Sequence, residues 1–149
     1  MNAIKDWEDG LTVIPLIKGT KVAAVKWRVY QSRRPTREEM MEWVIKYWQG
    51  NPNYGILCVN GLTVLDFEEF EVYQRYFPVT PKTRVVRTPH GGVHVYFYAV
   101  TPYTRRMKFK DYEYLGAGYV VGPGSIVDGV KYEFISNAPI LKTDLSRWR

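Results

Sequence analysis

Asp66 and Glu68 stand at the end of an apolar segment, residues 62–67, which predicts a buried strand. Because successive side chains of a strand alternate faces, the two carboxylates share one face and Phe67 points to the other. Neighbouring carboxylates repel each other and are costly to bury without a partner. A hard divalent cation such as Mg²⁺ or Mn²⁺, which prefers oxygen ligands and substrate phosphates, would remove that cost. The alternative is a strand that simply runs into an acidic turn.

A second segment combines histidines, glycines and arginines. Residues 83–88 and 93–98 predict two strands of a hairpin, joined by the turn Pro-His-Gly-Gly at 89–92. His94 shares one strand face with Tyr96 and Tyr98. The twin glycines would let a phosphate approach the backbone, and Arg84, Arg87 and His90 flank the turn. A single strand histidine is more often a structural group than a ligand, so both interpretations stay open here.

A third group of charged residues follows. Residues 101–111 are basic and predict a surface segment that follows a nucleic-acid backbone. The next residues, 111–115, predict the start of a strand on which Asp111 and Glu113 share a face.

The composition fits one globular domain with an anionic partner. The chain has 149 residues, of which 46% are hydrophobic and 24% charged, and its net charge is +6 with a pI of about 9.4. The single cysteine, Cys58, lies in an apolar run and predicts a core residue, without disulfide or cysteine-based zinc site. No signal peptide or membrane span is recognisable, so we expect a cytoplasmic protein with no membrane partner.

The remaining elements must position these groups. Residues 11–17 predict a strand, and Thr36 with Glu39 predicts a capping box that starts a helix running to about Gln49. Asn60-Gly61 between the apolar runs 55–59 and 62–67 predicts a hairpin. A short helix at 69–77, an extended run at 118–121 and a last strand at 129–134 complete the expected elements.

Several motifs, in this order and spacing, carry a resemblance to a known family: Ile14-Pro15-Leu16, Gly19-Thr20-Lys21, Trp27, Asn53 to Ile56, Leu65 to Glu68, Thr88 to Phe97, and Gly118 to Ser125 followed by Gly129 and Tyr132. Together they resemble the N-terminal Prim-Pol domain of bifunctional DNA primase–polymerases, in the archaeo-eukaryotic primase superfamily. The resemblance is strongest over residues 11–136 of a single domain spanning 1–149, and it points to the type encoded by archaeal plasmids, viruses or integrated elements.

The resemblance implies an α+β fold, with an α/β subdomain and an RRM-like antiparallel sheet. It implies a DNA-templated nucleotidyltransferase, a primase or polymerase that adds NTPs or dNTPs to a DNA primer–template in replication. A two-metal site holding Mg²⁺ or Mn²⁺, and no zinc, would stabilise both the attacking and the leaving oxygen.

The resemblance also implies roles for single residues. Asp66 and Glu68 would bind the metal, with Glu113 as the third acid and Asp111 as the fallback. His94 would bind the incoming triphosphate. The further expected nucleotide contacts are Arg87, Thr88, His90, Gly91, Gly92, Ser125 and Lys21.

The sequence departs from the family in three ways. Glu68 stands where Asp is common, and the closing block reads Gly-Pro-Gly-Ser where Pro-Pro-Ser is usual. The sequence also stops with the catalytic core, which favours primer extension over autonomous primer synthesis and suggests a helical primase domain, a helicase or another replication protein as partner.

Two other functions are open. One is a catalytically weak Prim-Pol-like module that binds single-stranded DNA as a replication accessory. The other is a metal nuclease using His90 and His94 with a tyrosine nucleophile, as in replication-initiator endonucleases. It is disfavoured because the paired histidines of those enzymes stand two apart on one strand face, whereas these are four apart and His90 lies in a turn.

Overall fold

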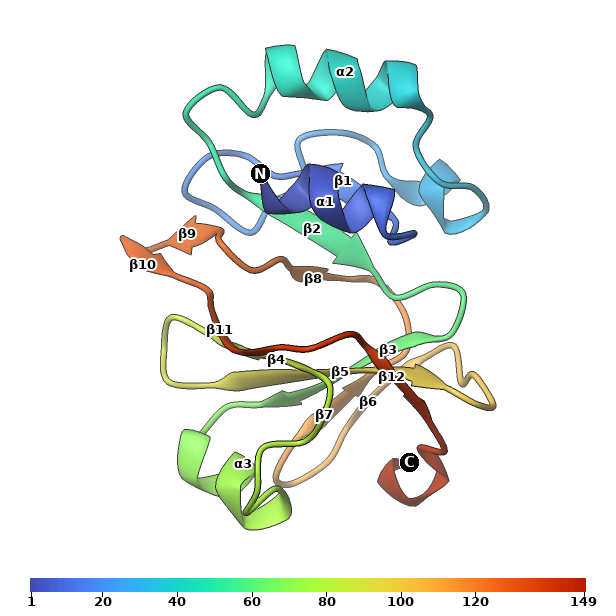
Figure 1. Ribbon diagram of the computed structural model, residues 1–149, viewed down its shortest axis with the longest axis vertical. Helices are drawn as coiled ribbons and strands as arrows, with labels where there is room; N and C mark the ends of the chain where they lie inside the picture. The colour runs from blue at the N-terminus through green and yellow to red at the C-terminus, as the bar shows by residue number, and fades with distance from the viewer. The chain divides into compact units, whose positions relative to one another are not determined.

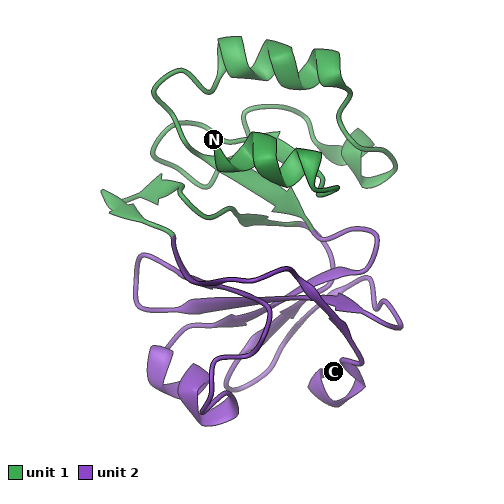
Figure 2. Ribbon diagram, viewed as in Figure 1, with its two compact units in different colours: residues 1–57, 119–132 green, residues 58–118, 133–149 purple.

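The structure, a computed structural model, describes residues 1–149 and divides into two compact units (Figure 2). The green unit comprises residues 1–57 and 119–132, and the purple unit comprises residues 58–118 and 133–149. Helices and antiparallel strands occur together, so the predicted α+β class is confirmed. No helix is long and apolar enough to cross a membrane.

The green unit contains a three-stranded antiparallel sheet with the order β1-β2-β8 (Figure 1). Its strands are β1 (Val13–Pro15), β2 (Tyr54–Leu57) and β8 (Tyr119–Val121). Helices α1 (Asn2–Glu8) and α2 (Arg37–Lys46), the short 3₁₀ helix η1 (Arg28–Gln31) and the small hairpin β9 (Ile126–Val127) with β10 (Val130–Lys131) complete this unit.

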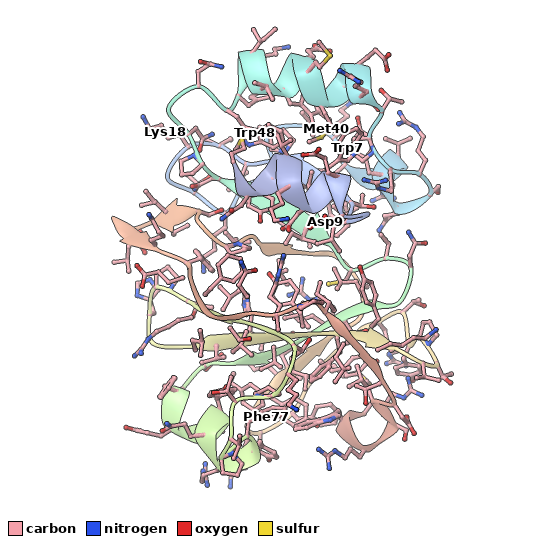
Figure 3. All side chains as sticks on the ribbon, viewed as in Figure 1. Trp7, Asp9, Lys18, Met40, Trp48 and Phe77 are labelled. Atoms are coloured by element: carbon pink, nitrogen blue, oxygen red, sulfur yellow. The ribbon has the colours of Figure 1, made fainter.

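The capping box predicted for α2 is confirmed. The Thr36 side chain accepts a hydrogen bond from the Glu39 amide, and the Glu39 carboxylate accepts one from the Thr36 amide. Hydrogen bonding to Arg33 lowers the pKa of Glu39 to about 2. Met40 and Trp48 are buried on the side of α2 that faces α1 (Figure 3). The helix ends at Lys46 rather than near the predicted Gln49, and the turn at Gly50 follows.

The purple unit is built on a seven-stranded sheet. Six strands follow the order β11-β4-β5-β3-β7-β6, and all neighbours in that order are antiparallel. The seventh strand pairs in parallel with β5. These strands are β3 (Leu62–Phe67), β4 (Arg84–Arg87), β5 (Val93–Ala99), β6 (Arg106–Lys108), β7 (Glu113–Leu115), β11 (Glu133–Asn137) and β12 (Leu141–Thr143).

One face of this sheet packs against α3 (Phe70–Tyr76) and the C-terminal 3₁₀ helix η2 (Ser146–Trp148), which lie on the same side of it (Figure 1). The core there includes Leu65, Phe67 and Val95 from the sheet. Phe77, labelled beside α3 in Figure 3, stacks on Trp148 with ring centroids 5.4 Å apart. Because strand side chains alternate, the residues between these core positions point to the opposite face.

The prediction that residues 55–59 and 62–67 pair as a hairpin is wrong. Strand β2 pairs with β1 and β8, whereas β3 pairs with β5 and β7. A turn does form, with positive φ at Asn60 and Gly61 and a 3.1 Å hydrogen bond from the Leu62 amide to the Val59 carbonyl. The chain passes from the green unit to the purple unit between Leu57 and Cys58, just before this turn. Both edges of β3 are occupied by other strands, so no edge is left for β2.

Other predictions hold with changed limits. The hairpin of β4 and β5 is confirmed, and α3 lies within the predicted 69–77. The expected last strand is divided between β10 and β11, and the C-terminal residues, for which no element is predicted, form β12 and η2. Burial raises the pKa of the Cys58 thiol to about 12, as befits a core residue.

Candidate functional site

Four charged or titratable side chains form a row across four adjacent strands of the purple sheet. In the strand register, Asp66 of β3 lies opposite His94 of β5 on one side and opposite Glu113 of β7 on the other. Glu113 in turn lies opposite Lys108 of β6. Since directly opposed residues of neighbouring strands point to the same face, the row Lys108–Glu113–Asp66–His94 is contiguous. Its face is the one that α3 does not cover.

Direct contacts support this row. The Nε2 atom of His94 lies 3.5 Å from Oδ1 of Asp66, and their side chains are 9% and 29% exposed. The Nζ atom of Lys108 lies 3.9 Å from Oε1 of Glu68, and both of these side chains are largely exposed. Glu68 itself follows β3 rather than belonging to it. Strand pairing thus fixes Asp66, whereas Glu68 can rotate.

A cavity of about 210 Å³ opens beside the carboxylates. Asp66, Glu68 and Glu113 line it, so the structure brings the three predicted acids to one place. No local sequence pattern singles out the basic and aromatic residues of its wall, which are Arg75, Lys108, Lys110, Phe109 and Tyr112. Lys108 was recognised only as part of a basic run, because its position opposite Glu113 depends on the register of a three-residue strand.

Glu113 and its predicted fallback, Asp111, have different surroundings. Glu113 is the direct cross-strand neighbour of Asp66. Asp111 also lines the cavity, but it precedes β7 and its Oδ2 accepts a 2.9 Å hydrogen bond from the Tyr76 hydroxyl. This hydrogen bond raises the pKa of Tyr76. The geometry therefore favours Glu113 as the third acid, with Asp111 holding α3 to the β6–β7 turn.

The predicted phosphate-binding turn packs closely against the end of β3. The Thr88 amide donates to the Gly92 carbonyl, and the Gly91 amide donates to the Thr88 carbonyl. A Cβ atom on Gly92 would come within 2.6 Å of the Phe67 carbonyl oxygen. Only glycine fits there, so Gly92 brings Thr88 and the exposed His90 to the strand end that precedes Glu68.

Arg87 lies on the other face of the sheet. It is paired with Val93, a residue of the α3-side core, and its guanidinium carbon lies 4.8 Å from the Phe70 ring centroid. The structure therefore does not bring Arg87 to the face of His94. Its contact with a nucleotide stays a prediction that requires it to leave Phe70.

Lys21 and Ser125 belong to the green unit. Lys21 is exposed, and its carbonyl accepts a 2.8 Å hydrogen bond from the Tyr119 hydroxyl. Ser125 is completely buried, and its Oγ accepts a 3.2 Å hydrogen bond from the Tyr54 amide. The Ser125 hydroxyl thus serves the fold, and the nucleotide contacts predicted for both residues stay predictions.

The acids fit a hard divalent cation by donor type, since all three are carboxylates. Asp66 and Glu113 carry like charges at opposed positions of adjacent strands, an arrangement that costs stability unless a cation offsets it. No three His, Cys, Asp or Glu side chains are already arranged around one metal position. Metal binding by all three acids would therefore require their side chains to turn toward one another.

Comparison with known families supplies the assignment. The family model for the N-terminal domain of bifunctional DNA primase/polymerase, Prim-Pol, matches residues 3–147. The chain belongs to the Prim-Pol family. No curated protein is similar enough in sequence to count as a match.

Membership of the Prim-Pol family confirms the resemblance seen in the motifs and extends it from residues 11–136 to residues 3–147. It supports a nucleotidyltransferase of the DNA primase and polymerase type, whose substrates are DNA and nucleotides. The archaeal plasmid or virus type stays a prediction from the motifs. The structure further disfavours the nuclease hypothesis, because His90 lies in the turn before β5 and only His94 lies on a strand.

Proposed function

We propose that the chain is a DNA-templated nucleotidyltransferase of replication, which joins an NTP or dNTP to a 3′ end at the carboxylate face of the purple sheet. The observation that carries the proposal is the row Lys108–Glu113–Asp66–His94, with two acids between two groups that can carry positive charge. Such a row offers adjacent positions for a divalent cation and for the phosphates of a nucleotide.

The acidic part of the row would hold Mg²⁺ or Mn²⁺. Asp66 and Glu113 are held by strand pairing, and the exposed Glu68 would join them by rotating away from Lys108. The bound cation would supply Lewis-acid stabilisation of the attacking and leaving oxygens. Holding two of three ligands on paired strands keeps the carboxylates in place before substrate arrives, which reduces the reorganisation needed on binding.

The basic part of the row would bind the triphosphate. His94 is fixed beside Asp66 and would donate a hydrogen bond from its ring to a phosphate oxygen. Lys108 would neutralise phosphate charge from the other end of the row. The turn at 88–92 would add the Thr88 hydroxyl, His90 and the backbone of its glycines. In the reaction, the oxygen of a primer 3′-hydroxyl bonds to the α-phosphorus and its proton passes to solvent, while the bond between the α-phosphorus and the leaving pyrophosphate breaks.

Primer extension on a labelled primer–template tests this proposal. Wild type is compared with Asp66→Asn and Glu113→Gln, using dNTPs or NTPs with Mg²⁺ or Mn²⁺. Both variants should lose incorporation by about 100-fold or more, because each removes a negatively charged ligand whose loss costs several kcal/mol of transition-state stabilisation. Asp111→Asn is the matched control, since it neutralises a carboxylate of the same cavity that is bound to Tyr76.

The outcomes separate the competing assignments. Activity that survives in Asp66→Asn would contradict the site. If activity is lost in Asp111→Asn and kept in Glu113→Gln, the third metal-binding acid is Asp111 rather than Glu113.

The accessory module is the second candidate. One observation favours it: no three potential ligands are already arranged around one metal position. Absence of incorporation by folded wild type with every metal and nucleotide, together with salt-sensitive DNA binding, would support this alternative.

A further inference from the structure

One segment of the green unit, residues 10–37, carries more net positive charge than the whole protein does. Residues 10–37 contain none of the 15 Asp and Glu residues and seven of the 21 Lys and Arg residues, which exceeds the net charge of +6. Two of the seven are engaged in the fold: Arg33 pairs with Glu39, and Arg34 donates to the Leu11 carbonyl. Lys26 and Arg28 are exposed and form no ion pair. This charge is therefore offered to solvent or to an anionic partner.

The side chain between Lys26 and Arg28 is an aromatic one, Trp27, and it is held in place by a second ring. The centroids of Trp27 and Tyr119 lie 5.3 Å apart with an interplanar angle of 85°. Tyr119 is itself fixed, since its hydroxyl bonds the Lys21 carbonyl and its ring covers Gly55, where a Cβ atom would come within 2.8 Å of it. Both rings are only partly buried. The indole is thus a pre-oriented, accessible platform.

These groups surround an open groove of about 820 Å³. Its residues come from β8 and from the segment between β1 and α2, which is drawn in blue in Figure 1. Aliphatic, aromatic and cationic side chains together form its wall. The groove residues that matter for binding are Val22, Val25, Lys26, Trp27, Arg28 and Tyr119. An unstacked base offers a flat apolar face with a phosphate on either side, and Trp27 stands between the cations Lys26 and Arg28 along the chain.

We propose that this groove binds single-stranded DNA, with a base stacked on Trp27 and the flanking phosphates held by Lys26 and Arg28. Duplex DNA would present phosphates to the cations but no base face to the indole, so the aromatic platform favours a single strand. The groove and the carboxylate row belong to different units, and strand binding needs neither metal nor nucleotide. The inference therefore stands or falls separately from the catalytic proposal.

Binding of a fluorescein-labelled oligothymidylate, followed by anisotropy in EDTA without nucleotide, tests this inference. Trp27→Ala should weaken binding by about 10-fold, as expected for loss of one base–aromatic stack. Lys26→Ala/Arg28→Ala should lower the slope of log affinity against log salt by about 1.4, since each single-strand phosphate contact contributes about 0.7. Lys46→Ala/Lys131→Ala removes two exposed charges of the same unit outside the groove and is the matched control.

Two further variants keep the result interpretable. Trp27→Phe retains a ring and should bind nearly as wild type, while the quenching of tryptophan fluorescence by DNA should largely disappear. Asp66→Asn should bind as wild type, which separates this site from the catalytic one. Equal affinities and equal salt slopes for the groove variants, the control and wild type would overturn the proposal. Preference for a duplex competitor, with no dependence on Trp27, would also overturn it.

Discussion

Glu113 has a neighbour of like charge on one side and a neighbour of opposite charge on the other, and this arrangement predicts how its neutralisation changes stability. Strand register places Asp66 and Lys108 directly opposite it on β3 and β6. Glu113→Gln therefore removes one repulsion and one attraction together. The two effects become separable when each neighbour is also neutralised, in Asp66→Asn and in Lys108→Gln.

The magnitudes follow from the sheet geometry. Directly opposed charged pairs on neighbouring strands change stability by about 0.2–1 kcal/mol. Asp66 is 29% exposed, so its repulsion of Glu113 should lie near the middle of that range, about 0.5 kcal/mol. Lys108 is 75% exposed, so its attraction should lie near the lower end, about 0.3 kcal/mol. In the wild-type background the two nearly cancel.

Glu113→Gln should therefore stabilise the Lys108→Gln background by about 0.5 kcal/mol and change wild type by little. In the Asp66→Asn background it should destabilise by about 0.3 kcal/mol. Urea unfolding of the single and double variants, without divalent metal, measures these differences as a double-mutant cycle. Asp111→Asn in the same three backgrounds is the control, because Asp111 is bound to Tyr76 and lies outside the row. Its effect should not depend on the background.

The ordering of the three effects is the decisive result. Identical effects of Glu113→Gln in all three backgrounds would mean that the side chain does not lie between Asp66 and Lys108. A destabilisation in the Lys108→Gln background would contradict the repulsion from Asp66. Either result would refute the register from which the candidate site is built.

Three further predictions concern the framework. Because the folded protein lowers the pKa of Glu39 to about 2, ionised Glu39 stabilises the fold above the unfolded-state pKa near 4.3, and this stabilisation is lost as the pH falls toward 2. In urea unfolding over this pH range, the free energy of unfolding of wild type should fall by ~1–2 kcal/mol more than that of Glu39→Gln. Gly92→Ala should lower the free energy of unfolding by ~1–3 kcal/mol and reduce primer extension, because the new Cβ would collide with the Phe67 carbonyl. Gly91→Ala is the control: no atom lies near its Cβ position, so it should lower the free energy of unfolding by only about 1 kcal/mol through backbone strain. Trp148→Ala should lower the free energy of unfolding by about 3 kcal/mol by removing the stack on Phe77, and unchanged thermal unfolding would contradict that packing.

Local sequence patterns correctly predicted those elements whose geometry depends only on residues close together in the chain. The capping box of α2 needs only two residues three apart, and both hydrogen bonds form. The hairpin of β4 and β5 needs a turn between two apolar runs, and it forms as well. Asn60-Gly61 meets the same criterion and makes a turn, yet the strands on its two sides belong to different sheets. A turn signal specifies backbone angles, whereas the partners of a strand depend on contacts distant in sequence.

The candidate site shows the same division. Alternation along one strand correctly placed Asp66 on the face opposite Phe67, since that inference stays within the strand. The sequence left Glu113 and Asp111 as alternatives because residues two apart in an expected strand point to the same face. Only the pairing of β7 with β3, and the hydrogen bond from Tyr76 to Asp111, distinguish them. Lys108 was missed for the same reason, because its relevance arises from a register that no local pattern encodes.

The different attachment of the three acids has a consequence for how the site would operate. The pairing of β3 with β7 holds the backbones of Asp66 and Glu113 side by side, so their like charges stay on neighbouring positions of the sheet. Glu68 lies beyond the end of β3, and its contact with Lys108 joins two largely exposed side chains at 3.9 Å. Such exposed pairs contribute little to stability, so a cation that attracts Glu68 or a phosphate that attracts Lys108 can break this one at small cost. The two ligands would therefore assist each other, because each releases the group that the other one needs.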